Sequence, residues 1–172
     1  ANAPVGSEGV VVLPFFNGER TPNLPNGRAS ITGMTAANTN RANICRAALE
    51  SAVFAMRGGL EAFRKLGFQP KEIRLIGGGS KSPLWRQIAA DVMNLPIRIP
   101  MLDEAAALGG AVQALWCLKN QTGKCDIAEL CAEHIKLDES KGAEPNAANV
   151  EAYNAAYENY CKLVDTVSPL YK

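Results

Sequence analysis

Three consecutive glycines, followed by a serine and a helix start, form the stretch of this chain best suited to chemistry. Gly77, Gly78 and Gly79 follow a short apolar run, and glycine has no Cβ, so a ligand can approach the backbone amides closely. Ser82 and Pro83 are residue types favoured at a helix N-cap and at the first helical position. A helix N-terminus carries unpaired N–H groups and the positive end of the helix dipole, so the stretch predicts an anion site, with phosphate among its ligands.

Two established phosphate loops do not fit this stretch. The dinucleotide pattern G-x-G-x-x-G requires glycine at its sixth position, which is Ser82 when counted from Gly77. The Walker loop requires four residues between its first glycine and Gly-Lys-[Ser/Thr], and no register provides them. Asp103 and Glu104 follow the next apolar run at about the distance of a ribose-binding acid. A degenerate Rossmann-type NAD site therefore stays open, as does a plain tight turn.

A charged pair in the N-terminal part of the chain is a second candidate for function. Glu19 and Arg20 directly follow an apolar strand pattern, in a loop with two prolines and two glycines. Functional residues are common on loops held by a rigid scaffold, so this loop could line a cleft. The alternative is a solvated loop whose charges pair with neighbouring residues.

No metal site is expected. The five cysteines contain no C-x-x-C pair, and their odd number argues against a complete disulfide framework. The spacing of Cys117, Cys125, Cys131 and His134 matches no standard zinc pattern.

Composition bounds the class of protein. The 172 residues are 47% hydrophobic, which suits one globular domain over residues 1–172, with residues 1–8 as a loop or a truncated end. The 18 basic and 17 acidic residues give a formal charge of +1, so we expect neither nucleic acid nor an anionic membrane as a partner. No apolar run approaches eighteen residues and no signal peptide pattern is present, so a soluble cytoplasmic protein is expected.

Alternating strand and helix patterns predict an α/β fold that would position these residues. Strands are expected at residues 9–16, 29–37, 72–76 and 95–100, and helices at 38–67, 83–94, 102–120, 124–135 and 147–167. Residues 72–100 then form a β-α-β crossover. Ligands of open α/β sheets bind outside the carboxyl ends of strands, so the glycine stretch and the helix start at Glu104 should form opposite walls of one cleft.

Small residues predict close helix packing at two places. Gly109 and Gly110 inside a helix each cost about 1 kcal/mol relative to alanine, which implies a close backbone approach there. Alanines at positions 42, 47, 48, 52 and 55 suggest that the first long helix packs closely against another element.

Four motifs along the chain resemble those of the FGGY-type carbohydrate kinases, most closely the members that phosphorylate xylulose. Residues 13–22 (LPFFNGERTP) resemble a loop of those members, and 29–34 (ASITGM) with 43–50 (NICRAALE) resemble the C-terminal family signature. Residues 76–80 (IGGGS), with Ser82, Trp85, Gln87 and residues 90–91, resemble the adenosine motif of the family. Residues 104–111 resemble its second nucleotide-side helix.

The resemblance implies the C-terminal domain of the actin-like, ribonuclease-H-like ATPase fold, with an incomplete sheet and flanking helices. It implies transfer of the γ-phosphoryl group of ATP, with Mg²⁺, to a pentulose sugar. Gly77, Gly78, Gly79, Ser80 and Ser82 would bind the adenosine side of ATP, with Gln87 and Glu104 as further nucleotide-side candidates.

The amino-terminal domain of the family, which carries the catalytic aspartate, has no counterpart in these residues. The resemblance therefore implies a kinase fragment whose partner is that missing domain, and it allows a homodimer. A non-catalytic nucleotide-binding or interaction domain of the same fold is the alternative.

Overall fold

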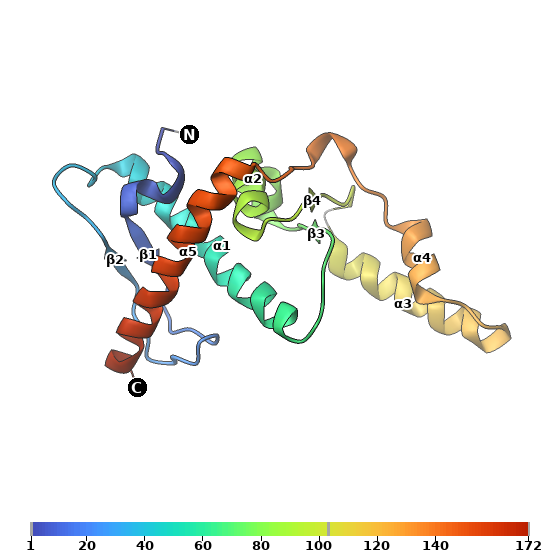
Figure 1. Cartoon of the computed structure of the whole chain (residues 1–172). Helices are drawn as coiled ribbons and strands as arrows, with labels where there is room; N and C mark the ends of the chain where they lie inside the picture. The colour runs from blue at the N-terminus through green and yellow to red at the C-terminus, as the bar shows by residue number, and fades with distance from the viewer. Residues whose placement is uncertain (1, 103, 172) are drawn as a thin grey trace.

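The computed structural model describes residues 2–102 and 104–171, and its helices follow the predicted order (Figure 1). A 3₁₀ segment, Val5–Gly9, precedes β1 and β2, and a second one, Gly78–Lys81, lies between β3 and α2. The elements are β1 (Val11–Leu13), β2 (Ser30–Thr32), α1 (Arg41–Lys65), β3 (Ile73–Arg74), α2 (Pro83–Met93), β4 (Ile97–Arg98), α3 (Ala105–Thr122), α4 (Ile127–His134) and α5 (Ala147–Val167).

The N-terminal half is a two-stranded antiparallel sheet packed with α1 and α5. Val12 of β1 pairs with Ile31 of β2, and all of β1 is buried, as the continuous apolar run predicted. Apolar side chains of β1, α1 and α5 form one core, in which Phe54 contacts Tyr153 edge-on with ring centroids 6.2 Å apart. This core fixes α1, against which α2 packs.

Two buried carboxylates hold α5 in place. Glu50 of α1 accepts hydrogen bonds from the Tyr153 hydroxyl (2.8 Å) and from the Ser7 hydroxyl (2.8 Å). Asp91 of α2 accepts bonds from the Asn146 backbone N–H (2.8 Å) and the Asn149 amide (2.8 Å) at the start of α5. A buried charge must be paired or hydrogen-bonded, and both carboxylates are satisfied by segments distant in sequence.

The second half contains the predicted β-α-β unit. Strands β3 and β4 are parallel, with Ile73 opposite Ile97 and Arg74 opposite Arg98. Both strands are shorter than predicted, because the hydrogen bonds from β3 to β4 run only from the Ile73 N–H to the Leu75 N–H before the chain turns at Gly77. The register places the carboxyl ends of both strands at one edge of the sheet.

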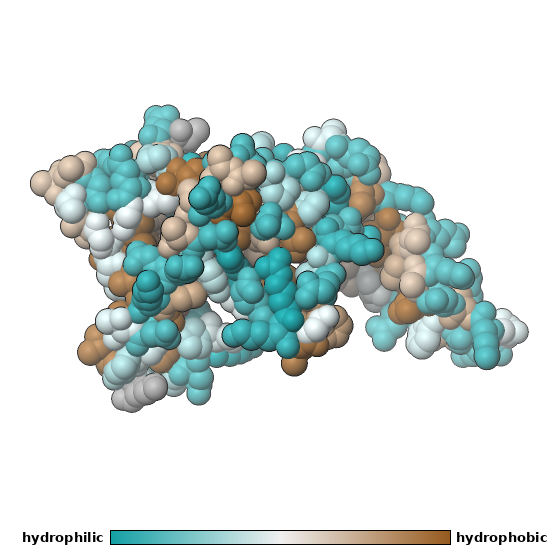
Figure 2. Space-filling view, in the orientation of Figure 1, coloured by the Kyte–Doolittle hydropathy of each residue, from teal (hydrophilic) through white to brown (hydrophobic). Residues whose placement is uncertain are grey.

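Helices α3 and α4 pack on each other and extend from the sheet as an arm (Figure 1). Val112 is the single buried residue of α3, and apolar surface (brown) alternates with hydrophilic surface along the arm in Figure 2. A Cβ built at Gly109 or Gly110 would meet no heavy atom within 4 Å among the described residues. The predicted close backbone approach at these glycines is therefore wrong for the described chain, because no element lies over that face of α3.

Candidate functional site

The glycine loop, defined here as residues 77–82, is held in shape by its own hydrogen bonds. Gly77 has φ 83°, a conformation that side chains rarely adopt. The buried Ser80 donates from its hydroxyl to the Gly77 carbonyl (2.7 Å), and the Ser80 N–H donates to the same oxygen (3.1 Å). These bonds fix the shape of the loop from within the chain, while Gly77 and Gly78 remain exposed.

Gly79 is glycine for a reason of packing. A Cβ built there would lie 1.8 Å from the Trp85 ring, far inside any real contact distance. The Trp85 indole N–H donates to the Leu49 carbonyl of α1 (3.3 Å), so the ring ties the loop to α1. A Cβ at Gly78 would meet no heavy atom within 4 Å in the described part of the chain. Gly77 and Gly78 are therefore the loop residues at which a ligand has open access to the backbone, and of the two only Gly77 also needs glycine for its positive φ.

Ser82 and Arg86 complete the helix start. The Ser82 hydroxyl accepts the Trp85 backbone N–H (3.3 Å), which confirms the predicted N-cap. Arg86 donates from Nη1 to the Ser80 carbonyl (2.7 Å), a contact that sequence reasoning missed because Arg86 lies on the polar side of the helical pattern. Its guanidinium adds positive charge beside the helix N-terminus, which favours an anionic ligand.

The second predicted wall begins at the same sheet edge. The glycine loop follows β3, Glu104 follows β4, and these strands are parallel in register. Glu104 is the exposed N-cap residue of α3, and among the described residues no backbone N–H of α3 caps onto its side chain. Asp103 lies outside the described residues. The shared edge meets the condition for one cleft, and the cleft itself stays a prediction.

Two candidate side chains, Gln87 and Glu19, are hydrogen-bonded away from the glycine loop, and a third, Arg20, is exposed in the same loop as Glu19. The Gln87 amide donates both to Asp91 Oδ1 (2.8 Å) and to the Glu144 carbonyl (2.8 Å), so it fastens the segment before α5 to α2. The Glu19 carboxylate accepts the N–H of Arg20 (2.7 Å) within its own loop, and Arg20 is exposed. The structure does not bring these side chains to the glycine loop.

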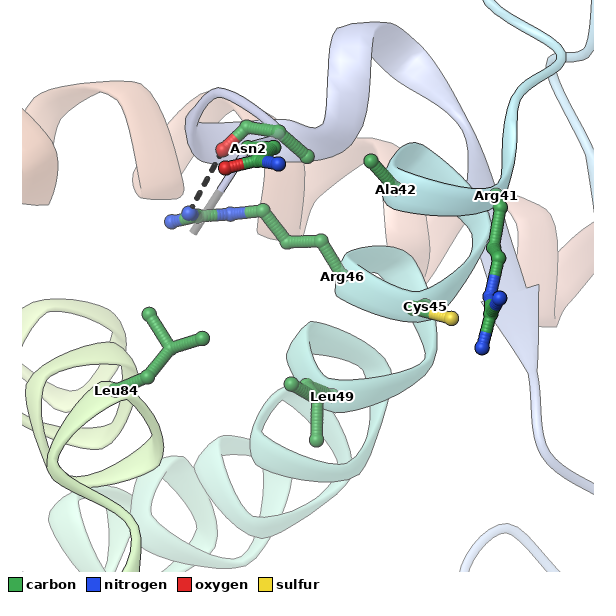
Figure 3. Close-up of a pocket in the computed structure, with 8 residues that line it drawn as sticks. Asn2, Arg41, Ala42, Cys45, Arg46, Leu49 and Leu84 are labelled. Carbon is green, nitrogen blue, oxygen red and sulfur yellow. Dashed lines mark hydrogen bonds between the residues drawn. The ribbon is translucent and has the colours of Figure 1, made fainter.

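A cavity of about 370 Å³ lies where the N-terminal residues approach α1 and α2 (Figure 3). Its lining includes Arg41, Arg46 and Leu49 of α1 and Leu84 of α2, and no residue of the glycine loop. Arg46 donates hydrogen bonds to the Ala3 carbonyl (3.0 Å) and to the buried Glu50 carboxylate (2.8 Å). Burial alone would lower the pKa of the Arg46 guanidinium, but its hydrogen bonds to Glu50 and Tyr153 outweigh that effect and raise the pKa. This arginine therefore serves the fold.

Within residues 2–102 and 104–171, no three His, Cys, Asp or Glu side chains are grouped as a metal site would require, and the five cysteines are free thiols. No helix of this part is both long and apolar enough to span a bilayer.

Comparison with known proteins places the chain in a family. The model of the "FGGY family of carbohydrate kinases, C-terminal domain" matches residues 1–118. A xylulose kinase of Haemophilus influenzae is 51% identical over 92% of this chain and 31% of its own length, and one of Bacillus subtilis is 32% identical over 91% and 30%. The crystal structure of a ligand-bound xylulose kinase from Lactobacillus acidophilus superposes with a TM-score of 0.88, at 26% identity over 98% of this chain and 33% of that one.

These matches confirm the predicted fold class, the C-terminal domain of the actin-like ATPase fold. The chain spans about a third of the length of the relatives it matches. On the family match over most of its residues and on its closeness to xylulose kinases, the chain belongs to the FGGY family of carbohydrate kinases and corresponds to their C-terminal domain.

Proposed function

We propose that this chain binds the adenosine side of ATP and forms the nucleotide half of a pentulose kinase. The observation that carries the proposal is the glycine loop, fixed in shape by bonds within the chain, open at Gly78 and placed at the carboxyl edge of two parallel strands. Ligands of open α/β sheets bind at that edge. The positive end of the α2 dipole and the Arg86 charge favour a nucleotide phosphate over a neutral ligand.

The proposed sugar substrate is D-xylulose, because the Haemophilus and Bacillus relatives described above are named xylulose kinases. Phosphoryl transfer requires a base within hydrogen-bonding reach of the sugar hydroxyl. Asp91 is buried and accepts three hydrogen bonds, which leaves it unable to serve as that base. The resemblance to the family implies a catalytic aspartate in the amino-terminal domain, and we place it there, outside these 172 residues.

Mg²⁺ would arrive with the ATP phosphates, as it does in phosphoryl transfer generally. The described residues contribute no cluster of ligands for it. A cytoplasmic location belongs to the same proposal, because cellular ATP would be the donor. The homodimer expected from the resemblance stays a prediction.

Calorimetric titration of the chain with ADP tests the nucleotide assignment. We expect weak binding, because half a cleft buries one side of the ligand and small-molecule pockets bury most of the ligand surface. Gly78→Val should weaken ADP binding by at least tenfold, since a branched side chain blocks approach to the amides. The open space at Gly78 means that the fold should tolerate this change.

NAD titration and a second glycine variant separate the alternatives. Gly59→Val, at an exposed helical position with the same open surroundings, is the control for the substitution itself and should leave ADP binding unchanged. Tighter binding of NAD than of ADP would favour the Rossmann-type alternative. Equal ADP affinity in wild type and Gly78→Val would contradict the proposed site.

A further inference from the structure

Three carbonyl oxygens of the glycine loop accept hydrogen bonds from the chain itself. The Gly77 oxygen accepts the Ser80 N–H (3.1 Å) and the Ser80 hydroxyl (2.7 Å), and the Gly79 oxygen accepts the Ser82 N–H (3.1 Å). The Ser80 oxygen accepts Nη1 of Arg86 (2.7 Å). A carbonyl oxygen carries partial negative charge and repels an anion, whereas backbone N–H groups attract one. Engaged carbonyls therefore favour a loop that binds a nucleotide.

The bond to the Ser80 carbonyl differs from the other two, because its donor is a side chain of α2. Ser80 itself is only 3% exposed, and its hydroxyl and N–H are both used inside the loop. A buried carbonyl without a donor costs free energy. Without Arg86, the Ser80 carbonyl would have to stay unpaired or turn toward water, and turning would move the loop backbone.

The glycines make the shape of the loop depend on such fixed points. Glycine loses more conformational freedom on folding than any other residue, because it has no Cβ to restrict its backbone. A Cβ built at Gly78 would meet no heavy atom within 4 Å in the described chain, so no side-chain packing fixes that residue. Its neighbours are held instead: the Trp85 ring lies against Gly79, and Arg86 binds the Ser80 carbonyl.

We propose that Arg86 is a positioning residue of the nucleotide site, which acts through the Ser80 carbonyl and the glycine loop and not by contact with the nucleotide. Held in this way, the loop presents the Gly78 backbone to the adenosine side of ATP. A site whose shape is fixed by the protein loses less free energy when a ligand orders it. The inference rests on the proposed function, because it takes the nucleotide as the ligand of the loop.

A charge effect of Arg86 and a positioning effect predict different results for different ligands. Positive charge beside a helix start strengthens the binding of ADP, which carries phosphates, and leaves neutral adenosine unaffected. A loop that has lost its shape binds both ligands more weakly. Adenosine is therefore the probe that isolates positioning.

Titration of the isotope-labelled chain with adenosine and with ADP measures both affinities. Arg86→Met keeps an unbranched stem and removes the donor, so adenosine affinity should fall by about tenfold, since bonds from charged donors are among the stronger ones. ADP affinity should fall at least as far. Arg64→Met is the matched control, because Arg64 also donates to a backbone carbonyl of α2, that of Met93 (3.3 Å), at the opposite end of the helix. It should leave adenosine affinity within about twofold of wild type, as a change remote from the site usually does.

Hydrogen exchange follows the loop without any ligand. The Ser80 and Ser82 N–H groups are bonded inside the loop, so their exchange reports how often the loop opens. Arg86→Met should speed both by about tenfold, the same factor expected for adenosine affinity. The amides of α5 should keep their rates, which separates loosening of the loop from destabilisation of the whole chain.

Arg86→Lys keeps a charged donor but lacks the rigid planar fork of arginine, so it should lie between Arg86→Met and wild type in both measurements. This milder variant decides the question if Arg86→Met does not fold.

Two results would overturn the inference. One is unchanged exchange at Ser80 and Ser82 in a folded Arg86 variant. The other is a loss of ADP affinity with adenosine affinity unchanged, which would assign Arg86 a role through its charge alone. A wild-type chain that binds neither ligand would contradict the proposed function, and the exchange rates would still decide whether Arg86 holds the loop. Binding of both ligands by a loop that does not respond to Arg86 would contradict only this inference.

Discussion

Gly78 and Gly79 are neighbours in the loop but are glycine for different reasons. At Gly79 a side chain would collide with Trp85, whereas at Gly78 it would point into open space. Intolerance to substitution at Gly79 would therefore report packing, whereas a loss of binding on substitution at Gly78 would report ligand approach. The sequence showed three equivalent glycines, because the position of the Trp85 ring depends on its hydrogen bond to Leu49, 36 residues away.

Gly79→Ala should lower the free energy of unfolding by about 1 to 3 kcal/mol, the usual cost of forcing extra volume into a packed site. The added Cβ cannot be accommodated unless the rigid Trp85 ring shifts. Urea unfolding would measure the difference. Gly78→Ala is the matched control and should change stability by less than about 0.5 kcal/mol, as surface substitutions usually do. Equal losses in the two variants would show that the Trp85 contact does not constrain the loop.

The sequence pattern predicted the helices, but it did not predict the tertiary contacts between them. The amphipathic pattern gave α5 at residues 147–167 and the residue types gave the Ser82 cap, and the structure confirms both. The pattern could not show that Gln87 bonds the Glu144 carbonyl, a contact across 57 residues that draws this nucleotide-side candidate into a structural role. Helix periodicity indicates which face of a helix is buried, whereas tertiary packing decides which residues each side chain contacts.

The buried Asp91 is the junction between α2 and α5. Asp91→Asn should destabilise the chain by about 1.5 to 3 kcal/mol, because it removes a charged acceptor and points an amide N–H toward other donors. The three bonds at stake come from Gln87, Asn146 and Asn149. Thermal unfolding of the variant would test this. Glu151→Gln, an exposed carboxylate on α5, should leave the midpoint unchanged, and a similar loss there would show that α5 responds to overall charge.

For the whole molecule, the packing of α5 on the N-terminal half predicts a loss of stability at high pH. Burial, reinforced by the Glu19 carboxylate, raises the pKa of Tyr160 to about 12. The folded state therefore favours the protonated phenol. This contribution is complete below the unfolded pKa of about 10 and is lost as pH rises through about 12.

Between pH 10 and 12, Tyr160 alone should cost about 1.4 kcal/mol of stability per pH unit. The free energy of unfolding of wild type and Tyr160→Phe, measured by urea at pH 9, 10 and 11, isolates this effect, since other titrating groups are common to both proteins. The wild-type advantage should shrink above pH 10. A difference that stays constant with pH would show that the Tyr160 hydroxyl is not desolvated by α5 packing.

We propose that the glycine loop and the start of α3 bind adenine nucleotide together from one edge of the sheet. Amide chemical-shift mapping of the isotope-labelled chain during titration with Mg-ADP tests it most directly. We expect the largest shifts at the Gly78 and Gly79 amides and at the helix start after Glu104, with the loop of Glu19 and Arg20 unaffected. Saturable shifts elsewhere, with Gly78 and Gly79 silent, would contradict it.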